Sequence, residues 1–203
     1  MTTGKAPHPC FQAVVNRDES FLESHWETCR DIKTQDGTTL LMLASAKGDN
    51  DIITYLLRKG VDINETDLDQ STAINYAVVT NQLGAATFLV MSGADLESKR
   101  KDGLTALMTA VQIGTYPMVK TLTTTGQALN SSAEDGWTPL YFAIRRQDPQ
   151  ILIHLLRRGA CKNVKDVENI SPLDFAKEVK WAVGQKILKM APSCGPKKKH
   201  SSK

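Results

Sequence analysis

Apolar and polar positions along this chain follow a pattern that returns every 33 residues. Each period holds two short apolar segments of helical spacing, separated by polar residues. Thr138-Pro139 and Asp148-Pro149 precede two such segments, and both pairs are typical of a helix start, because the side-chain oxygen caps free amides and proline fits the first turn. Neither short helix can bury its apolar face alone, so the pattern predicts an all-α solenoid of stacked helix-turn-helix units. The alanine column shows the period: Ala44, Ala77, Ala110, Ala143 and Ala176.

The same period divides the chain into a domain and two ends. Five repeats begin near residues 34, 67, 100, 133 and 166. A degenerate unit at 8–33 precedes them at an offset of 31, and is expected to cap the stack. We therefore expect a repeat domain at 8–190, an N-terminal extension at 1–7 and a basic, disordered tail at 191–203.

The fourth repeat carries the clearest motif, DGWTPLYFA at 135–143 followed by LLRRGA at 155–160. This motif resembles an ankyrin repeat, and the resemblance extends over roughly residues 9–190. It implies a slightly curved stack of helix pairs, with hairpin-like loops projecting from one edge and a long concave surface.

The sequence departs from that family at two kinds of position. Gln70 and Asn169 replace the glycine of the turn in two repeats. The family's usual histidine after Thr-Pro-Leu is absent from every repeat, which puts the hydrogen bonds it normally makes in the loops in doubt. Its column holds Met42, Asn75, Met108, Tyr141 and Asp174.

Local stability is expected to differ between repeats. Ala85-Ala86 and Thr123-Thr124-Thr125 occupy second-helix stretches where larger aliphatic residues are usual. Alanine leaves little to pack, and threonine is a poor helix former. We expect the second and third repeats to be less stable than the fourth, whose second helix carries five aliphatic residues.

The resemblance implies that a partner contacts the loop tips and the exposed side of the first helix of each pair. Several large apolar residues fall at these positions, where small polar residues would suffice for folding. Trp137 lies in the same repeat as Arg145 and Arg146, and tryptophan and arginine are enriched among binding hot spots. The alternative is that Trp137 packs on its own helix and only stabilises a loop. The partner-binding candidates are Leu68, Val79, Lys101, Leu104, Gln112, Ile113, Glu134, Trp137, Arg145, Arg146 and Ile170.

Catalytic chemistry finds little support in the sequence. No phosphate-binding G-x-x-x-x-G-K-[ST] motif and no G-x-S-x-G nucleophile motif occurs. His154 lies in an apolar helical segment and is interpreted as a helix-surface residue. We therefore predict no enzyme activity, no catalytic residue, no cofactor and no small-molecule substrate.

The four cysteines, Cys10, Cys29, Cys161 and Cys194, include no C-x-x-C pair. They are interpreted as free thiols in a reducing compartment, packed as small apolar residues. His25 and Cys29 are four residues apart, but two ligands do not make a structural zinc site, which needs four. No metal site is predicted.

Net charge is +3, and the excess lies in the tail, where residues 192–203 hold four lysines and no acidic residue. Without these lysines the chain carries 21 basic against 22 acidic residues, so the composition does not support a nucleic-acid partner. Apolar stretches are too short to span a membrane, and the N-terminus lacks a secretory pattern. A cytoplasmic or nuclear location is expected.

Together these features predict a non-enzymatic adaptor or regulatory subunit that binds another protein through the concave groove. Small stand-alone ankyrin-repeat proteins, which this chain resembles, include kinase inhibitors and subunits, so a protein kinase complex is one expected partner. The alternative is a nuclear transcriptional cofactor, with Pro196-Lys197-Lys198-Lys199 as the import signal.

Overall fold

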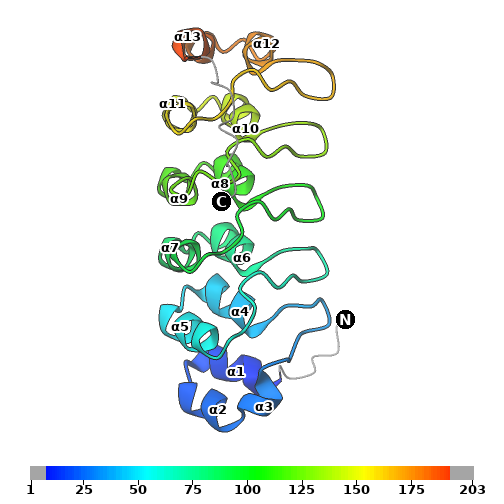
Figure 1. Cartoon of the computed structure of the whole chain (residues 1–203), viewed down its shortest axis with the longest axis vertical. Helices are drawn as coiled ribbons and strands as arrows, with labels where there is room; N and C mark the ends of the chain where they lie inside the picture. Colours follow the sequence, from blue (N-terminus) through cyan, green and yellow to red (C-terminus); the bar gives the residue numbers. More distant parts are fainter. Residues whose placement is uncertain (1–7, 193–203) are drawn as a thin grey trace, which may run out of the picture.

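The structure of the protein is a computed structural model that describes residues 8–192. Helices α4, α6, α8, α10 and α12 form an inner column and α5, α7, α9, α11 and α13 an outer column, while α1–α3 close one end (Figure 1). The predicted all-α stack is confirmed; the expectations for residues 1–7 and 193–203 fall outside the described part. The helices are α1 (Pro9–Asn16), α2 (Glu19–Ser24), α3 (Trp26–Cys29), α4 (Leu40–Lys47), α5 (Asn50–Arg58), α6 (Ala73–Val79), α7 (Leu83–Met91), α8 (Ala106–Ile113), α9 (Tyr116–Leu122), α10 (Pro139–Arg146), α11 (Pro149–Arg157), α12 (Pro172–Glu178) and α13 (Ala182–Met190).

The helix starts follow the capping chemistry of the repeat. Thr39 Oγ1 accepts the amide hydrogen of Met42 at 3.2 Å at the start of α4. Asp148 Oδ1 accepts the amide hydrogen of Ile151 at 2.9 Å at the start of α11. Each bond satisfies an amide that has no partner inside the helix, which is why these residue types recur at the same place in the period.

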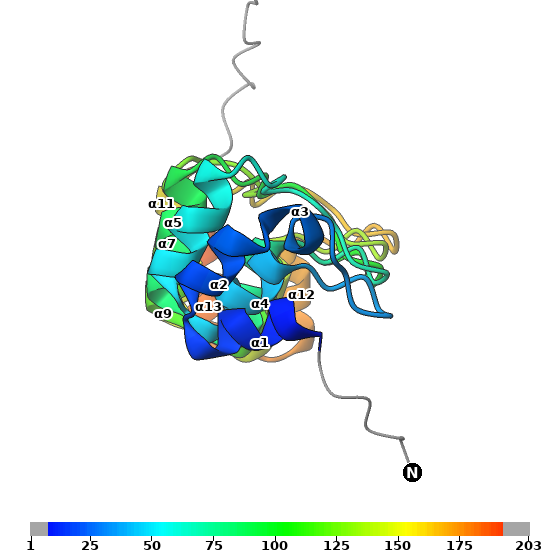
Figure 2. The ribbon, with the colours of Figure 1, turned by 90° about the horizontal axis from the view of Figure 1, so that it is seen from below.

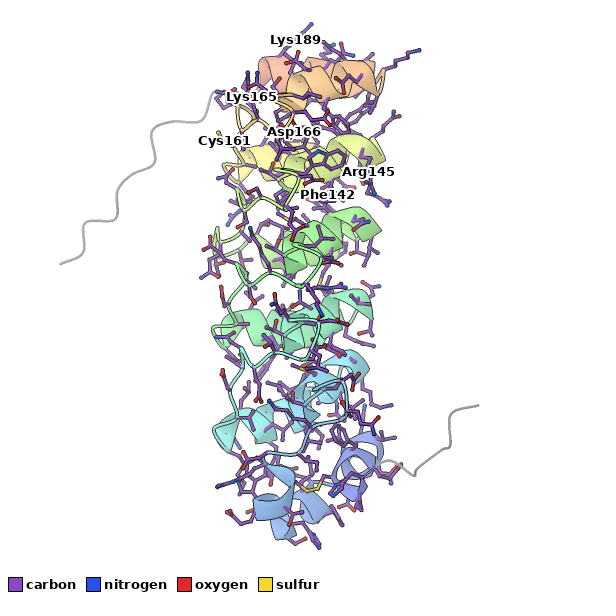
Figure 3. The ribbon with its side chains drawn as sticks, turned by 90° about the vertical axis from the view of Figure 1, so that its right-hand side faces the viewer. Phe142, Arg145, Cys161, Lys165, Asp166 and Lys189 are labelled. Carbon is purple, nitrogen blue, oxygen red and sulfur yellow. A yellow bond between two sulfur atoms is a disulfide. The ribbon has the colours of Figure 1, made fainter. Side chains whose placement is uncertain are left out.

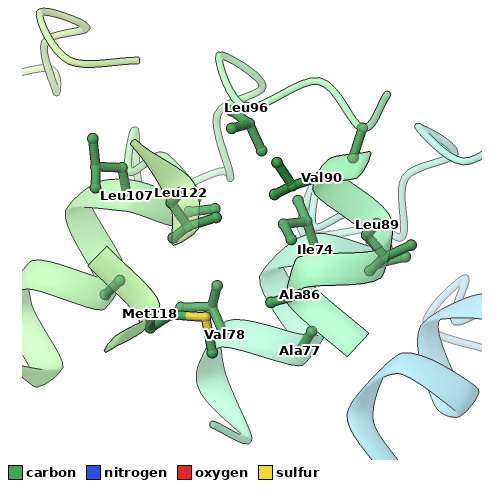
Figure 4. Packing of buried hydrophobic residues seen from close by; sticks show 14 of the residues in the cluster. Ile74, Ala77, Val78, Ala86, Leu89, Val90, Leu96, Leu107, Met118 and Leu122 are labelled. Atoms are coloured by element: carbon green, nitrogen blue, oxygen red, sulfur yellow. The ribbon is translucent and has the colours of Figure 1, made fainter. Parts of the chain in front are cut away.

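The apolar core runs through the whole stack between the two helix columns. Every member of the alanine column is fully buried, and this small side chain lets neighbouring inner helices approach closely. Between the second and third repeats, Val78 of α6 lies beside Met118 of α9 (Figure 4), and Ile74 and Leu122 belong to the same core. No helix within residues 8–192 is long and apolar enough to cross a membrane.

Four kinds of side chain replace the hydrogen bonds of the missing histidine in the five repeats. The Sδ atoms of Met42 and Met108 accept the threonine amides at the starts of α4 and α8, at 3.3 and 3.5 Å. Asn75 Oδ1 accepts the amide hydrogen of Thr72 at 2.9 Å. Tyr141 instead donates its hydroxyl proton to two loop carbonyls, at 2.8 and 2.6 Å. In the last repeat, Asp174 accepts a hydrogen bond from the capping serine hydroxyl at 2.6 Å. The first and third repeats thus use the same methionine bond, and each of the other three repeats uses a different one.

Two of the turns adopt left-handed backbone without glycine. Gln70 has φ +58° and Asn169 has φ +65° in the positions that glycine occupies elsewhere. In both turns an aspartate at the start of the loop holds the backbone: Asp67 Oδ1 accepts the amide of Ser71 at 2.8 Å, and Asp166 Oδ1 that of Ile170 at 2.9 Å. These bonds support a conformation that costs a non-glycine residue about 1 kcal/mol or more.

The expectation of free thiols is wrong. Cys10 of α1 and Cys29 of α3 are buried and form a disulfide, the yellow bond in Figure 3, and Cys161 is also disulfide-bonded. The Cα atoms of Cys10 and Cys29 lie 5.5 Å apart, a proximity that depends on how α1 and α3 pack and that a sequence separation of 19 does not reveal. Disulfides persist mainly in oxidising compartments, so this bond also argues against the predicted reducing environment.

Candidate functional site

Five hairpin-like loops project from the same side of the stack, as the view along it shows (Figure 2). In each loop the amide of the first residue donates to the carbonyl of the fifth, for example Arg100 to Leu104 at 3.0 Å. We call the loops 34–38, 67–71, 100–104, 133–137 and 166–170 the finger loops. The finger loops and the exposed sides of the inner helices form the inner face of the molecule.

Backbone hydrogen bonds join the tips of neighbouring finger loops. The amide of Leu68 donates to the carbonyl of Asp36 at 2.9 Å, and that of Lys101 to the carbonyl of Asp69 at 2.8 Å. The fifth loop is tied to the fourth in the same way, at 3.0 Å. Among the described residues, Glu134 makes no corresponding bond to the third loop. The ties fix the spacing of the tips and thereby position the side chains on the inner face.

All the predicted partner-binding residues lie on finger loops or inner helices, and most of them are exposed. Leu68, Val79 and Ile113 are 67%, 54% and 43% exposed, which is unusual for large apolar side chains. Leu104, Trp137 and Ile170 are half-buried. The remaining candidates are exposed polar or charged residues: Lys101, Gln112, Glu134, Arg145 and Arg146.

Trp137 belongs to an aromatic cluster that joins two repeats. Its ring stacks on Tyr141 at 5.8 Å between centroids and contacts Phe142 edge-on at 5.6 Å, both on α10. It also packs on Phe175 of α12 at 4.9 Å. The alternative interpretation is therefore correct in that Trp137 packs on its own helix, but the contact with Phe175 also makes it a link to the next repeat.

Arg145 covers the aromatic cluster from the solvent side. Its guanidinium carbon lies 5.6 Å from the Trp137 ring centroid and 6.0 Å from that of Phe142, within the range of a cation–π contact. Figure 3 shows Phe142 and Arg145 close together on α10. The cluster thus presents a half-buried indole beneath an exposed cation that forms no ion pair within residues 8–192, an arrangement suited to an aromatic or acidic partner residue.

Arg146 and Gln112 are brought together, and their contact supports the fold. Arg146 Nη1 donates to the backbone carbonyl of Gln112 at 2.7 Å, near the end of α8. Its guanidinium lies over Gly114, where a Cβ atom would come within 2.1 Å of Nη2. A cation at a helix C-terminus is favourable, so Arg146 caps the helix of the preceding repeat.

A small cavity that was not predicted opens between the second finger loop and α6. We call this cavity, of about 220 Å³, the notch. Burial raises the pKa of Tyr76 at its wall, and the adjacent Asp67 carboxylate raises it further. Asn75 was noted in the sequence only because it stands in the histidine column. Its short side chain was the available signal that space would remain there. The notch is lined among others by Asp67, Asp69, Asn75, Tyr76, Val79 and Arg100.

His154 is held in a structural role. Its Nε2 lies 2.8 Å from Thr123 Oγ1, and its ring meets that of Tyr116 edge-on. Burial lowers the pKa of His154, and the nearby cations Arg158 and Lys120 lower it further. No group of three or more metal-binding side chains was found among residues 8–192, and Cys29, four residues from His25, is bonded to another cysteine.

Comparisons with known proteins agree with this architecture. The family model described as ankyrin repeats (3 copies) matches residues 10–100 and 92–166. A solved ankyrin repeat domain from Acinetobacter baumannii AYE is 30% identical, with a TM-score of 0.80, and the alignment covers 92% of this chain and 98% of that one. A search of curated proteins found no match.

Proposed function

Because the chain belongs to the ankyrin-repeat family, whose members generally mediate protein–protein interaction, we propose that it binds a segment of another protein across its inner face. The fold is typically a non-enzymatic scaffold, and the chain is proposed to act without catalysis. The contact surface would consist of the predicted partner-binding residues, with the Trp137 cluster at its centre.

One observation carries this proposal: exposed apolar side chains and the Arg145-covered Trp137 cluster lie on the same face. Leu68, Val79 and Ile113 are exposed there although folding does not require apolar residues at these positions. Hot spots are enriched in tryptophan, tyrosine and arginine, and here Trp137 of the fourth finger loop lies beneath Arg145 of α10.

The identity of the partner is a finer proposal. An adaptor or regulatory subunit of a protein kinase complex rests on family analogy alone. The nuclear cofactor alternative depends on lysines at 197–199, which lie outside the described residues. The Cys10–Cys29 disulfide weighs against both cytoplasmic and nuclear roles, since thiols there are kept reduced. The first search for a partner should therefore include proteins of oxidising compartments as well as protein kinases.

The test is affinity purification from the source cells with four baits: wild type, Arg145→Ala, Trp137→Ala with Arg145→Ala, and Arg157→Ala. Arg157 is the matched control, because it is an exposed arginine on the outer helix α11. We expect a partner that the wild type and the Arg157 variant retain and the double variant loses. Truncating Trp137 is expected to weaken the recovered complex by about 2 kcal/mol or more.

Folding must be separated from binding in this test, because Trp137 also packs on Tyr141 and Phe175. Arg145→Ala serves this purpose, since it removes an exposed side chain and leaves the aromatic rings in place. Thermal denaturation should show a wild-type midpoint for this variant together with weaker binding. A dissociation constant that neither variant changes would remove Trp137 and Arg145 from the interface and would contradict the proposal.

A further inference from the structure

The notch lies beside Asn75, whose side chain is short where the fourth repeat has the long side chain of Tyr141. Tyr141 reaches from α10 to the carbonyls of Val164 and Ile170 in the next loop, at 2.8 and 2.6 Å. Asn75 stands 66 residues earlier, at the equivalent position on α6, and its amide bonds only Thr72. A cavity of about 220 Å³ lies next to Asn75, between the second finger loop and α6, with Arg100 of the next finger loop in its lining.

Two of the residues that line this cavity, Asn75 and Arg100, each carry a buried hydrogen-bond donor without a partner among the described residues. Asn75 is 3% exposed, its Oδ1 accepts both bonds from Thr72, and its Nδ2 is buried without a hydrogen-bond partner among the described residues. Nε of Arg100 is likewise buried and unpartnered. Buried donors without partners are rare in folded proteins, because each costs about 1–3 kcal/mol. Two on one cavity indicate an oxygen acceptor that comes from outside the chain.

The acidic groups of the notch differ in their availability. Both carboxylate oxygens of Asp67 already accept hydrogen bonds. Its Oδ1 accepts from the amides of Asp69 and Ser71, and its Oδ2 accepts from the Tyr76 hydroxyl at 2.7 Å. The Asp69 carboxylate lines the cavity and makes no hydrogen bond or ion pair with the described residues. The notch therefore offers two donors and one free carboxylate acceptor.

Charge decides which ligand group matches this set. The two aspartates outweigh the single charge of Arg100, which is itself 3.3 Å from Asp102, so a carboxylate ligand would enter a negative site. An ammonium group carries only hydrogen-bond donors, so it cannot accept from Asn75 or Arg100, and its positive charge would be repelled by that of Arg100. A primary carboxamide fits both requirements: its oxygen accepts from Asn75 and Arg100, and its NH₂ donates to Asp69.

We propose that the notch binds the carboxamide side chain of a glutamine or asparagine in the partner segment. The cavity is below the 300–1,000 Å³ typical of drug-sized ligands, and therefore suits one side chain rather than a whole small molecule. The exposed Val79 at its rim continues the inner face, so this inference rests on the proposed function and specifies what the partner presents at the second repeat.

The experiment titrates the ¹⁵N-labelled full chain with four capped amino acids, N-acetyl-N-methylamides of glutamine, glutamate, lysine and alanine. The glutamine probe should shift the side-chain signals of Asn75 Nδ2 and Arg100 Nε, with an affinity at least about tenfold above the others, as the loss of a paired donor implies. The alanine probe carries main-chain amides only. Equal shifts with alanine, or stronger shifts with glutamate, would overturn the assignment.

Two variants separate binding from folding. Asn75→His introduces the family's usual residue, whose ring fills the notch, and is expected to abolish the shift of Arg100 Nε without lowering the melting temperature. Arg100→Lys keeps the charge but removes the Nε donor, and should weaken the glutamine probe about tenfold. Unchanged glutamine binding by both variants would contradict the proposal.

Failure of the two proposals is distinguishable. If the probe does not bind but the Arg145 variant still loses its partner, only the notch is refuted. If the probe binds but neither the Arg145 variant nor the double variant affects partner capture, the notch stands and the proposed function fails.

Discussion

Removal of the Cys10–Cys29 disulfide is expected to destabilise the N-terminal capping unit far more than the rest of the stack. The bond closes a loop with a sequence separation of 19. A chain-entropy treatment assigns about 3 kcal/mol at 25 °C to closing a loop of this size in the unfolded chain. The double variant Cys10→Ala with Cys29→Ala should lose about that amount.

The loss should be local, because each repeat contacts only its neighbours. The unit consists of three short helices of eight, six and four residues, too short to be stable alone. It docks on the first repeat, through the edge-on packing of Trp26 on Tyr55 at 5.9 Å and polar contacts such as Arg17 with Asp49 at 2.9 Å. Opening of α1–α3 should therefore precede opening of the repeats.

Native-state amide hydrogen exchange provides the assay. Amides of α1 should exchange on the order of 100-fold faster in the double variant, as a loss of about 3 kcal/mol implies. Amides of α10 and α11 should change little and serve as the internal control. Wild type treated with a reducing agent should match the variant in α1. A change of less than about threefold in α1, or an equal change throughout the stack, would refute this reasoning.

Three further predictions concern the repeats. Tyr141→Phe should lower the free energy of unfolding by about 2 kcal/mol in urea denaturation, because two loop carbonyls lose their donor; a neutral result would contradict this. Because the pKa of His154 is lowered in the folded protein, the unfolded chain takes up this proton at a higher pH than the folded chain does. The free energy of unfolding of the wild type should therefore decrease as the pH falls below 6.5. The free energy of unfolding of the His154→Gln variant should decrease less between pH 7 and pH 5. An equal decrease in both proteins, measured by urea denaturation, would show that His154 is not the cause. Amides at 82–91 and 117–125 should exchange faster than those at 149–158; the reverse order would refute the stability gradient expected from the sequence.

Much of the fold follows from local sequence chemistry. A threonine, serine or aspartate precedes most helices of the repeats, and the fully buried alanine column recurs at the same period, so the helix positions and the core-facing side can be inferred from the order of residues. The predicted partner-binding residues likewise lie on finger loops and inner helices, since register within a repeat fixes which side of the helix a residue faces.

Contacts between side chains of neighbouring repeats could not be predicted from the sequence pattern. Trp137 packs on Phe175, and Arg146 reaches the carbonyl of Gln112, each on a neighbouring repeat. Whether such a side chain is free to bind or is engaged in the fold depends on how far it reaches across the interface between repeats. The periodic pattern shows where each side chain stands within its repeat, but not whether it contacts the neighbouring repeat.

The helix pairs of the five repeats, with their number and their period, follow from the order of residues alone, because capping and apolar spacing act within a few residues of one another. The pairing of Cys10 with Cys29, and the common cavity that Asn75 and Arg100 face, emerge only when the helices are stacked. Both outcomes depend on distances between segments that stacking brings together. Small differences in side-chain length then decide whether the space between two packed segments is filled by side chains or remains a cavity.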